Sequence, residues 1–257
     1  MLQVLHVPTL VDNYVWLIRR PDRPEVIIVD PGEDYPVLEK LETEKLVPVA
    51  ILVTHYHYDH TGGLDPLLRR FPVPVYGPQH IRQVDHPVAE GDSVRIEALD
   101  VEFQVLDVRG HTHDHIAYLT GKQLFCGDVI FSAGCGRLRD GTLEQMAQAV
   151  ARLAALPDDT IVYCAHEYTA ANLKFAAAVE PGNPDIYEYK QWVNEQRRRQ
   201  LPTLPTTIGK EKRINPFLRV DQETVIAAAR SHDSDMKSTE PTEVFITLRR
   251  WKDGFRG

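Results

Sequence analysis

Short apolar runs separated by turn residues fill the first two thirds of the chain. VWLIRR leads through PDRPE into VIIVDPG, which predicts a β-hairpin ending in a turn at 30–32. A helix at 35–45, the strand AILVT, a short helix in GGLDPLLRRF and the strand VPVYGP follow. Next come four closely spaced strands, in DSVRIEAL, VEFQVLDV, HIAYLT and QLFCGD, then the helix TLEQMAQAVARLAAL and the strand IVYCAH. This order of elements predicts a layered α/β sandwich rather than a single doubly wound sheet.

The pattern changes at about residue 169, where helical periodicity replaces the strands. TAANLKFAAAVEP predicts a helix that ends near Pro181, and Pro184 opens a second helix in DIYEYKQWVNEQRRR. A proline-spaced connector, LPTLPTTIGKEKRINPF, leads to a third helix in DQETVIAAAR. We therefore predict two domains, a catalytic one at 1–168 and a mostly helical one at 169–257.

Charge is divided unevenly between these two parts. The chain has 257 residues, of which 43% are apolar and 26% charged, as in an ordinary globular protein. Residues 1–168 hold 14 Lys and Arg against 25 Asp and Glu, whereas 169–257 hold 15 against 12. The net charge of −8 argues against nucleic acid as a partner. Acidic ligands for a cation in the first part, and basic contacts for an anion in the second, would fit this division.

Nothing in the sequence has the pattern of an exported or membrane-bound protein. The first residues, MLQVLHVPTLVDNYVW, lack the features of a secretory signal or a transit peptide. No apolar run approaches the roughly 20 residues that cross a bilayer. The three cysteines, Cys126, Cys135 and Cys164, contain no CxxC pair, so we expect no disulfide framework. We expect a cytoplasmic protein without a membrane partner, acting as a monomer.

The segment THYHYDH at 54–60 follows the apolar run VAILV directly. Ionisable groups at the end of a buried strand are costly unless they are paired or bind a metal. Imidazole nitrogen and carboxylate oxygen suit zinc, iron or manganese. Polar residues follow three other apolar runs in the same way, which is where active-site groups gather in layered α/β folds. The candidates are His55, His57, Asp59 and His60 in the first segment, and His111, Asp128 and His166 in the others.

Seven side chains are too many for one zinc ion, which takes about four ligands. Two ions that share a carboxylate and a water accommodate all seven. The hypothesis is therefore a pair of divalent metal ions, with zinc expected and iron or manganese as alternatives. The assignment is His55, His57 and His111 for the first ion, Asp59, His60 and His166 for the second, and Asp128 with a hydroxide as the bridge.

These motifs resemble the metallo-β-lactamase fold. The segments AGCGR, HEYTAANLKFA and NPFLR and the basic tail add a specific resemblance to the glyoxalase II (hydroxyacylglutathione hydrolase) family, in order along essentially the whole chain. The resemblance implies a four-layer αββα sandwich followed by a mostly helical C-terminal domain. It also implies hydrolysis of S-D-lactoylglutathione to D-lactate and glutathione, the second step of methylglyoxal detoxification.

A small-molecule glutathione thioester carries carboxylates, so its site should be cationic. A hydroxide between two cations can attack the acyl carbon, and a thiolate, whose thiol has a pKa of about 8.5, leaves without much help from an acid. Asp59 is the carboxylate best placed to orient this hydroxide or to move its proton. Arg139 stands where some members of the family have a tyrosine, which leaves its role open. The resemblance places glutathione contacts at Arg137, Tyr168, Asn172, Arg249 and Lys252.

Four other functions deserve comparison. A β-lactamase would be exported, and an RNA-processing nuclease of this fold would carry a basic surface. A persulfide dioxygenase also handles glutathione, but it uses one iron and would not need the second set of ligands. A metal-dependent binding module without catalysis would require a closed, saturated site. The lack of a signal argues against the β-lactamase, the charge of −8 against the nuclease, and room for a water against the binding module. The second ligand set, the basic tail and the helical C-terminal region favour the thioesterase over the persulfide dioxygenase.

Several other polar and aromatic residues have simpler interpretations. We expect His115 to pack beside the site rather than to bind a metal, and His113 to lie in a loop. The arginines at 197–199 are expected on a solvated helix face, with contact to an acidic surface as the alternative. Tyr56 and Tyr58, inside THYHYDH, are expected to pack against the protein.

Overall fold

The computed structural model describes residues 2–257, in which the chain forms two compact units. Unit 1 comprises Met1–Asp107 and Asp114–Gly127, and unit 2 comprises Val108–His113 and Asp128–Gly257. This division differs from the predicted domain boundary at residue 168, which stays a prediction. Within residues 2–257, no helix has both the length and the apolar character needed to span a bilayer.

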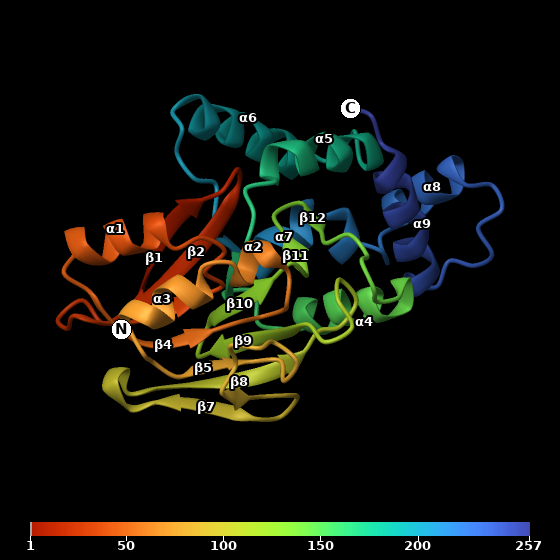
Figure 1. Ribbon diagram of the computed structural model, residues 1–257. Coiled ribbons are helices and arrows are strands. Elements are labelled where there is room, and N and C mark those ends of the chain that lie inside the picture. Colours follow the sequence, from red (N-terminus) through yellow and green to blue (C-terminus); the bar gives the residue numbers. More distant parts are fainter. Residues whose placement is uncertain (1) are drawn as a thin grey trace. The chain divides into compact units, whose positions relative to one another are not determined.

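Unit 1 contains a six-stranded sheet with the order β1-β2-β3-β4-β5-β6 (Figure 1). β1, β2 and β3 are antiparallel, so the predicted hairpin at β2 and β3 is confirmed. β3, β4 and β5 are parallel, because helical connections return the chain to the same edge of the sheet. The strands are β1 (Gln3–Thr9), β2 (Asn13–Arg19), β3 (Glu25–Val29), β4 (Val47–Leu52), β5 (Val75–Gly77) and β6 (His86–Pro87).

Both faces of this sheet are covered, as the near-continuous apolar runs of its strands require. Helices α1 (Tyr35–Thr43) and α3 (Leu64–Arg70) lie along one face (Figure 1), and Leu41 and Leu67 share a buried core cluster with Ile28. Adjacent residues on β2, Leu17 and Ile18, point to opposite faces and are both fully buried. The sheet therefore has a second covering layer.

That layer is an antiparallel meander, also in unit 1. It consists of β7 (Ser93–Ile96), β8 (Val101–Asp107), β9 (Ile116–Thr120) and β10 (Gln123–Gly127), with the 3₁₀ turn η1 (Glu97–Leu99) between the first two. The hydroxyl of Tyr118 on β9 lies 3.0 Å from the carbonyl oxygen of Val53 and 3.1 Å from that of Tyr76. These contacts hold the meander against the carboxyl ends of β4 and β5, where the segment THYHYDH begins.

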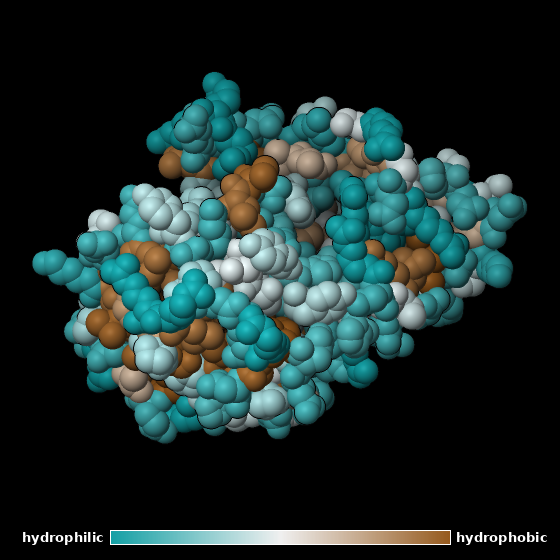
Figure 2. All heavy atoms as spheres, in the orientation of Figure 1, coloured by the Kyte–Doolittle hydropathy of each residue, from teal (hydrophilic) through white to brown (hydrophobic). Residues whose placement is uncertain are grey.

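Unit 2 is mostly helical, with two short strand pairs. Leu173 on α5, with Ile186 and Val193 on α6, forms a buried cluster between these two helices. The outer face of α6 is hydrophilic (Figure 2), and residues 197–199 are exposed, so the predicted solvated face is confirmed. The elements are β11 (Ile130–Phe131), β12 (Gly134–Cys135), α4 (Leu143–Ala154), β13 (Ile161–Cys164), α5 (Thr169–Val179), α6 (Pro184–Arg198), β14 (Thr206–Thr207), α7 (Ile208–Ile214), η2 (Pro216–Leu218), α8 (Glu223–His232) and α9 (Pro241–Gly254).

Helix α4 begins with the capping box that its sequence predicts. The Thr142 hydroxyl accepts a hydrogen bond from the backbone N–H of Gln145, and the Gln145 side chain accepts one from the N–H of Thr142. Thr142→Ala should lower the free energy of unfolding by about 1 kcal/mol, because a backbone donor loses its partner. Urea denaturation measures this change, with Thr43→Ala at an exposed position of α1 as control. Equal effects of the two substitutions would contradict the role of the cap.

Candidate active site

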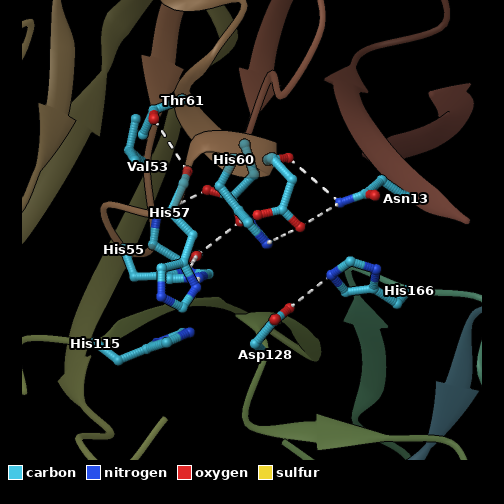
Figure 3. Close-up of polar contacts among 12 residues, drawn as sticks. Asn13, Val53, His55, His57, His60, Thr61, His115, Asp128 and His166 are labelled. Carbon is cyan, nitrogen blue, oxygen red and sulfur yellow. Dashed lines mark hydrogen bonds and ion pairs between the residues drawn. The ribbon is translucent and has the colours of Figure 1, made fainter. Parts of the chain in front are cut away.

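Unit 1 presents four of the predicted ligands where β4 ends. Thr54 and His55 are fully buried after the strand, and His57 then caps the short helix α2 (Tyr58–Thr61). Asp59 and His60 lie in the first turn of α2. Figure 3 shows His55, His57 and His60 projecting from this turn, so the strand end and the helix start bring the segment's polar side chains together.

A buried carboxylate that the sequence analysis did not select, Asp30, holds this turn in place. It accepts hydrogen bonds from the backbone N–H of Thr54 at 2.7 Å and from the Thr54 hydroxyl at 2.7 Å. One of its oxygens also lies 3.0 Å from Nδ1 of His60. A carboxylate on one ring nitrogen fixes the ring orientation and makes Nε2 the ligand atom. Asp30 therefore positions His60.

Two imidazole nitrogens face each other within this cluster. Nε2 of His55 lies 3.0 Å from Nδ1 of His57, and Nδ1 of His55 lies 3.0 Å from the Thr54 hydroxyl. Two neutral rings can meet in this way either by sharing a proton or by directing both nitrogens to one cation. The ring of His115 stacks on that of His55, with centroids 4.5 Å apart, so the predicted packing role of His115 is confirmed.

Asp59 is held by the first residue of β2, Asn13. The side-chain amide of Asn13 donates to the Asp59 carboxylate at 3.1 Å and also lies 3.3 Å from the Asp59 carbonyl oxygen (Figure 3). A hydrogen-bonded carboxylate keeps one orientation, so Asn13 directs the group to which the sequence assigns metal binding and proton transfer. Sequence reasoning missed Asn13 because an asparagine beside a turn usually hydrogen-bonds the turn itself, whereas Asn13 opens β2.

Unit 2 holds the other three predicted ligands, with His111 and His166 on either side of Asp128. One oxygen of Asp128 lies 3.3 Å from Nε2 of His111, and the other lies 3.3 Å from Nε2 of His166. Figure 3 shows Asp128 and His166 pointing toward each other. Each carboxylate oxygen thus serves a different histidine, which is the arrangement that a bridging carboxylate needs.

Backbone geometry around Asp128 depends on two glycines. Gly127 has a φ of 49°, and a side chain there would also meet the Thr54 hydroxyl at 2.4 Å. At Gly136 a Cβ atom would lie 2.0 Å from the Asp128 carbonyl oxygen. Glycine adopts this conformation more readily than other residues, and only glycine leaves room for these close approaches. The glycines of FCGD and AGCGR are therefore required by the turn that presents Asp128.

The donor set of both units fits divalent cations. The side chains of His55, His60, His111, Asp128 and His166 are all buried. Nδ1 of His111 contacts the carbonyl oxygen of Arg137 at 2.6 Å, as Nδ1 of His60 contacts Asp30. Histidines that bind metals characteristically engage the other ring nitrogen with a carboxylate or a carbonyl in this way. These His/Asp clusters therefore have the chemistry of a metal site.

The predicted substrate contacts all lie in unit 2, and they differ in exposure. Arg137 is exposed, and Tyr168 is half-buried with its ring stacked on that of His166 at 4.7 Å. Asn172 is buried, and its amide donates to the carbonyl oxygen of Ser132 at 3.1 Å. Asn172 thus supports the backbone next to the site, and its direct contact with a substrate stays a prediction.

The two predicted cations of α9 have different surroundings. Arg249 is only 1% exposed, and it donates to the carbonyl oxygen of Cys135 at 3.1 Å and to Asp253 at 2.9 Å. Lys252 is half-buried, with its ammonium 5.1 Å from the centre of the Phe175 ring. Lys252 is therefore the more accessible anion contact, whereas Arg249 links α9 to the backbone of β12.

Comparison with known protein families places the chain without ambiguity. The model of the metallo-β-lactamase superfamily matches residues 8–166, and that of the hydroxyacylglutathione hydrolase C-terminus matches residues 167–255. A curated hydroxyacylglutathione hydrolase from Aliivibrio fischeri is 49% identical, with 99% of this chain and 100% of the relative covered. The chain belongs to the hydroxyacylglutathione hydrolase family. A second member, from Nitrosomonas europaea, is 45% identical over 100% of this chain and 98% of its own length.

Solved structures agree with the metallo-β-lactamase fold of this chain. ETHE1 from Myxococcus xanthus has a TM-score of 0.66 and 25% identity, covering 97% of this chain and 90% of its own. The protein TTHA1623, solved in a di-iron-bound form, has a TM-score of 0.57 and 25% identity, covering 82% and 98%. The predicted fold class, a metallo-β-lactamase fold with a C-terminal helical region, is confirmed.

Predictions for the remaining residues of the chain had mixed outcomes. His113 lies in the predicted loop, where its ring contacts Asp140 at 3.0 Å. Tyr56 packs against the core of unit 1, as predicted. Tyr58 is 77% exposed, so its predicted packing role is wrong. It occupies the outer side of α2, because Asp59 and His60 take the positions that face inward.

Proposed function

We infer that the chain hydrolyses glutathione thioesters of 2-hydroxy acids, with S-D-lactoylglutathione as substrate and D-lactate and glutathione as products. The observation that carries this function is the match to the hydroxyacylglutathione hydrolase C-terminus over residues 167–255, joined to full-length relatives of that name. The superfamily fold alone would leave several hydrolytic reactions open.

We propose that the two ligand clusters form one dinuclear metal site, in which Asp128 is the bridge. The opposed orientation of its two oxygens toward His111 and His166 supports this arrangement. Zinc is the expected metal, since it accepts imidazole and carboxylate ligands, although iron and manganese accept them too. Metal ions bound there would lower the pKa of water and polarise the thioester carbonyl. The remaining ligands would be His55, His57 and His111 for one ion, and Asp59, His60 and His166 for the other.

The protein's own groups prepare the reaction around these ions. Asn13 fixes the Asp59 carboxylate, which we propose orients the attacking water and accepts its proton. The bond that breaks joins the acyl carbon to sulfur, and the glutathione thiolate leaves without protonation because thiols are acidic enough. The proposed site therefore needs no separate general acid.

Cations of unit 2 would bind the glutathione carboxylates. We propose that Arg137 and Lys252 make these contacts, with Tyr168 beside the acyl group and Arg249 supporting the backbone of β12. We also propose a functional boundary near residue 168, between a catalytic domain at 1–168, which would supply Arg137 and Tyr168, and a glutathione-binding domain at 169–257, which would supply Lys252. A cytoplasmic location and a monomeric state also stay predictions, which cell fractionation and light scattering can test.

Binding should depend on pH through Lys252. Burial lowers the pKa of its ammonium to about 8, and the charges of Arg249 and Arg137 act in the same direction, whereas Cys135 and Asp253 oppose them. Since a lysine with a lowered pKa loses its charge sooner as the pH rises, the KM for S-D-lactoylglutathione should increase through about pH 8. Lys252→Arg, which stays charged, should remove this increase. A KM that is constant between pH 7 and 9.5 would exclude Lys252 as a contact.

The function is tested by comparing three substrates on the metal-loaded protein. We expect release of free thiol from S-D-lactoylglutathione, and no comparable turnover of a penicillin or consumption of oxygen with glutathione persulfide. Oxygen consumption without thioester hydrolysis would replace the proposed function with a persulfide dioxygenase. Penicillin hydrolysis without thioester hydrolysis would replace it with a β-lactamase.

A further inference from the structure

A carboxylate outside the proposed metal and substrate contacts is completely buried in unit 2. Glu211 lies on α7, in the segment that the sequence predicts to be a connector, and it is 0% exposed. An ionised carboxylate away from water is costly unless donors surround it. Burial raises the pKa of Glu211, and hydrogen bonds from Thr206, Ala133, Ser132 and Asn215 act against that increase.

Four uncharged donors meet the two oxygens of Glu211. Oε1 accepts hydrogen bonds from the hydroxyls of Ser132 at 2.9 Å and Thr206 at 2.6 Å. Oε2 accepts from the backbone N–H of Ala133 at 2.7 Å and from the side-chain amide of Asn215 at 3.0 Å. The hydroxyls can rotate to donate or accept, but the two N–H groups can only donate. The side-chain atom at the position of Oε2 must therefore be a hydrogen-bond acceptor.

These contacts converge on the tip of the β11–β12 hairpin. Ala133 has a φ of 58°, a left-handed conformation that a non-glycine residue adopts only when its surroundings hold it. Asn215, which Glu211 contacts, also donates to the carbonyl oxygens of Phe131 at 3.2 Å and Gly134 at 2.9 Å. Glu211 and its partner thus bind the backbone on both sides of the strained residue.

The same hairpin carries groups that the proposed reaction uses. Its second strand ends at Cys135, whose carbonyl oxygen accepts the hydrogen bond of Arg249. Two residues further on, the carbonyl oxygen of Arg137 contacts Nδ1 of His111 at 2.6 Å. A change in the backbone at 132–134 would therefore move Arg137 and turn the ring of His111 together.

We propose that Glu211 is a positioning residue of the hydrolase, acting through the backbone conformation at Ser132–Ala133 on Arg137 and His111. This role rests on the proposed function. It requires an acceptor that reaches the N–H of Ala133, and it does not require the negative charge. Length and charge can be separated by substitution, since glutamine keeps the length without the charge and aspartate keeps the charge on a shorter side chain.

The test compares Glu211→Gln, Glu211→Asp and Glu211→Ala in the full-length, metal-loaded protein. We expect E211Q to stay within about threefold of the wild type in kcat/KM for S-D-lactoylglutathione. E211D and E211A should lose about 10- to 100-fold, the usual effect of removing a group that orients a metal ligand. In these two variants, KM should rise because Arg137 is displaced, and kcat should fall because the ring of His111 is turned.

Two measurements that do not depend on turnover accompany the kinetics. The amide hydrogen of Ala133 should exchange at least tenfold faster in E211D than in E211Q, and a chelator should remove metal faster from E211D. If the wild type fails to hydrolyse the thioester, the proposed function is wrong, but exchange and metal release still test the role of Glu211. If E211A does not fold, the comparison of E211D with E211Q still tests the proposed role of Glu211. Full activity in E211D with loss in E211Q, or equal exchange at Ala133 in both, would overturn the proposal.

Discussion

Asp128→Ala should remove metal and activity together. Asp128 faces His111 with one oxygen and His166 with the other, so its loss takes a ligand from both proposed metal positions. Removing a group that only orients a metal ligand typically costs about 10- to 100-fold, so loss of the bridge should cost on the order of 10³-fold in kcat/KM. Metal analysis of the purified variant should find fewer than two ions per chain.

A matched control separates this effect from the loss of any carboxylate. Asp158 is exposed and pairs with Lys212 at 2.7 Å, so Asp158→Ala should leave metal content and kcat/KM unchanged. Circular dichroism should show both variants folded. A folded D128A protein that retained two metal ions and more than a tenth of the activity would exclude Asp128 as the bridging ligand.

Lys252→Glu should weaken the binding of glutathione thioesters selectively. A hydrogen bond between charged groups contributes about 1.5–3 kcal/mol, which corresponds to roughly 10- to 100-fold in affinity. We therefore expect the KM for S-D-lactoylglutathione to rise by about that factor. The kcat/KM for a small uncharged thioester should change by less than about twofold, because that substrate has no carboxylate to bind.

Lys174→Glu provides the control for K252E, since Lys174 is also a cation of unit 2 and is exposed on α5. Its KM values should equal those of the wild type for both substrates. If K252E impaired the two thioesters equally, the variant would be acting on the metal site or the fold, and the glutathione carboxylates would bind elsewhere. We choose Lys252 over Arg249 because burial of Arg249 makes its substitution a test of folding as well.

Most strands of the first two thirds, and the candidate ligands that follow them, could be identified from local sequence, but β1, β6, β11 and β12 were not predicted. Strand ends followed by polar residues stand out because apolar runs such as VAILV stop abruptly at THYHYDH. The capping box at Thr142 has a fixed spacing, and the structure contains it. Such signals depend only on residues that are neighbours in the sequence, so they can be recognised without knowledge of the fold.

The elements that were missed depend on tertiary packing. No helix was predicted for α9, in which the six consecutive residues 244–249 are buried. Two of them, Thr247 and Arg249, are polar, so burial in this helix does not follow the local pattern of polarity. The segment interpreted as a connector contains β14, α7 and η2, which are short and interrupted by prolines. These elements place the side chains of Glu211 and Asn215 in the interior. Burial of single polar side chains gives no hydrophobic periodicity in the sequence.

The supporting groups of the site were missed for a related reason. Asp30 follows the apolar strand VIIV just as the ligands follow theirs, but Pro31 and Gly32 led to its interpretation as a turn residue. Its contacts with Thr54 and His60 join segments about 30 residues apart in the sequence. Asn13 lies 46 residues from Asp59. Pairings across such distances are set by the sheet order rather than by sequence spacing.

Metal titration of the metal-free protein tests the central claim most directly. Zinc is added in defined steps, and both bound metal and the rate of thiol release from S-D-lactoylglutathione are measured on each sample. The dinuclear thioesterase predicts that activity rises to a plateau at two equivalents of zinc per chain. A plateau of full activity at one equivalent, or two bound ions without thioester hydrolysis, would contradict it.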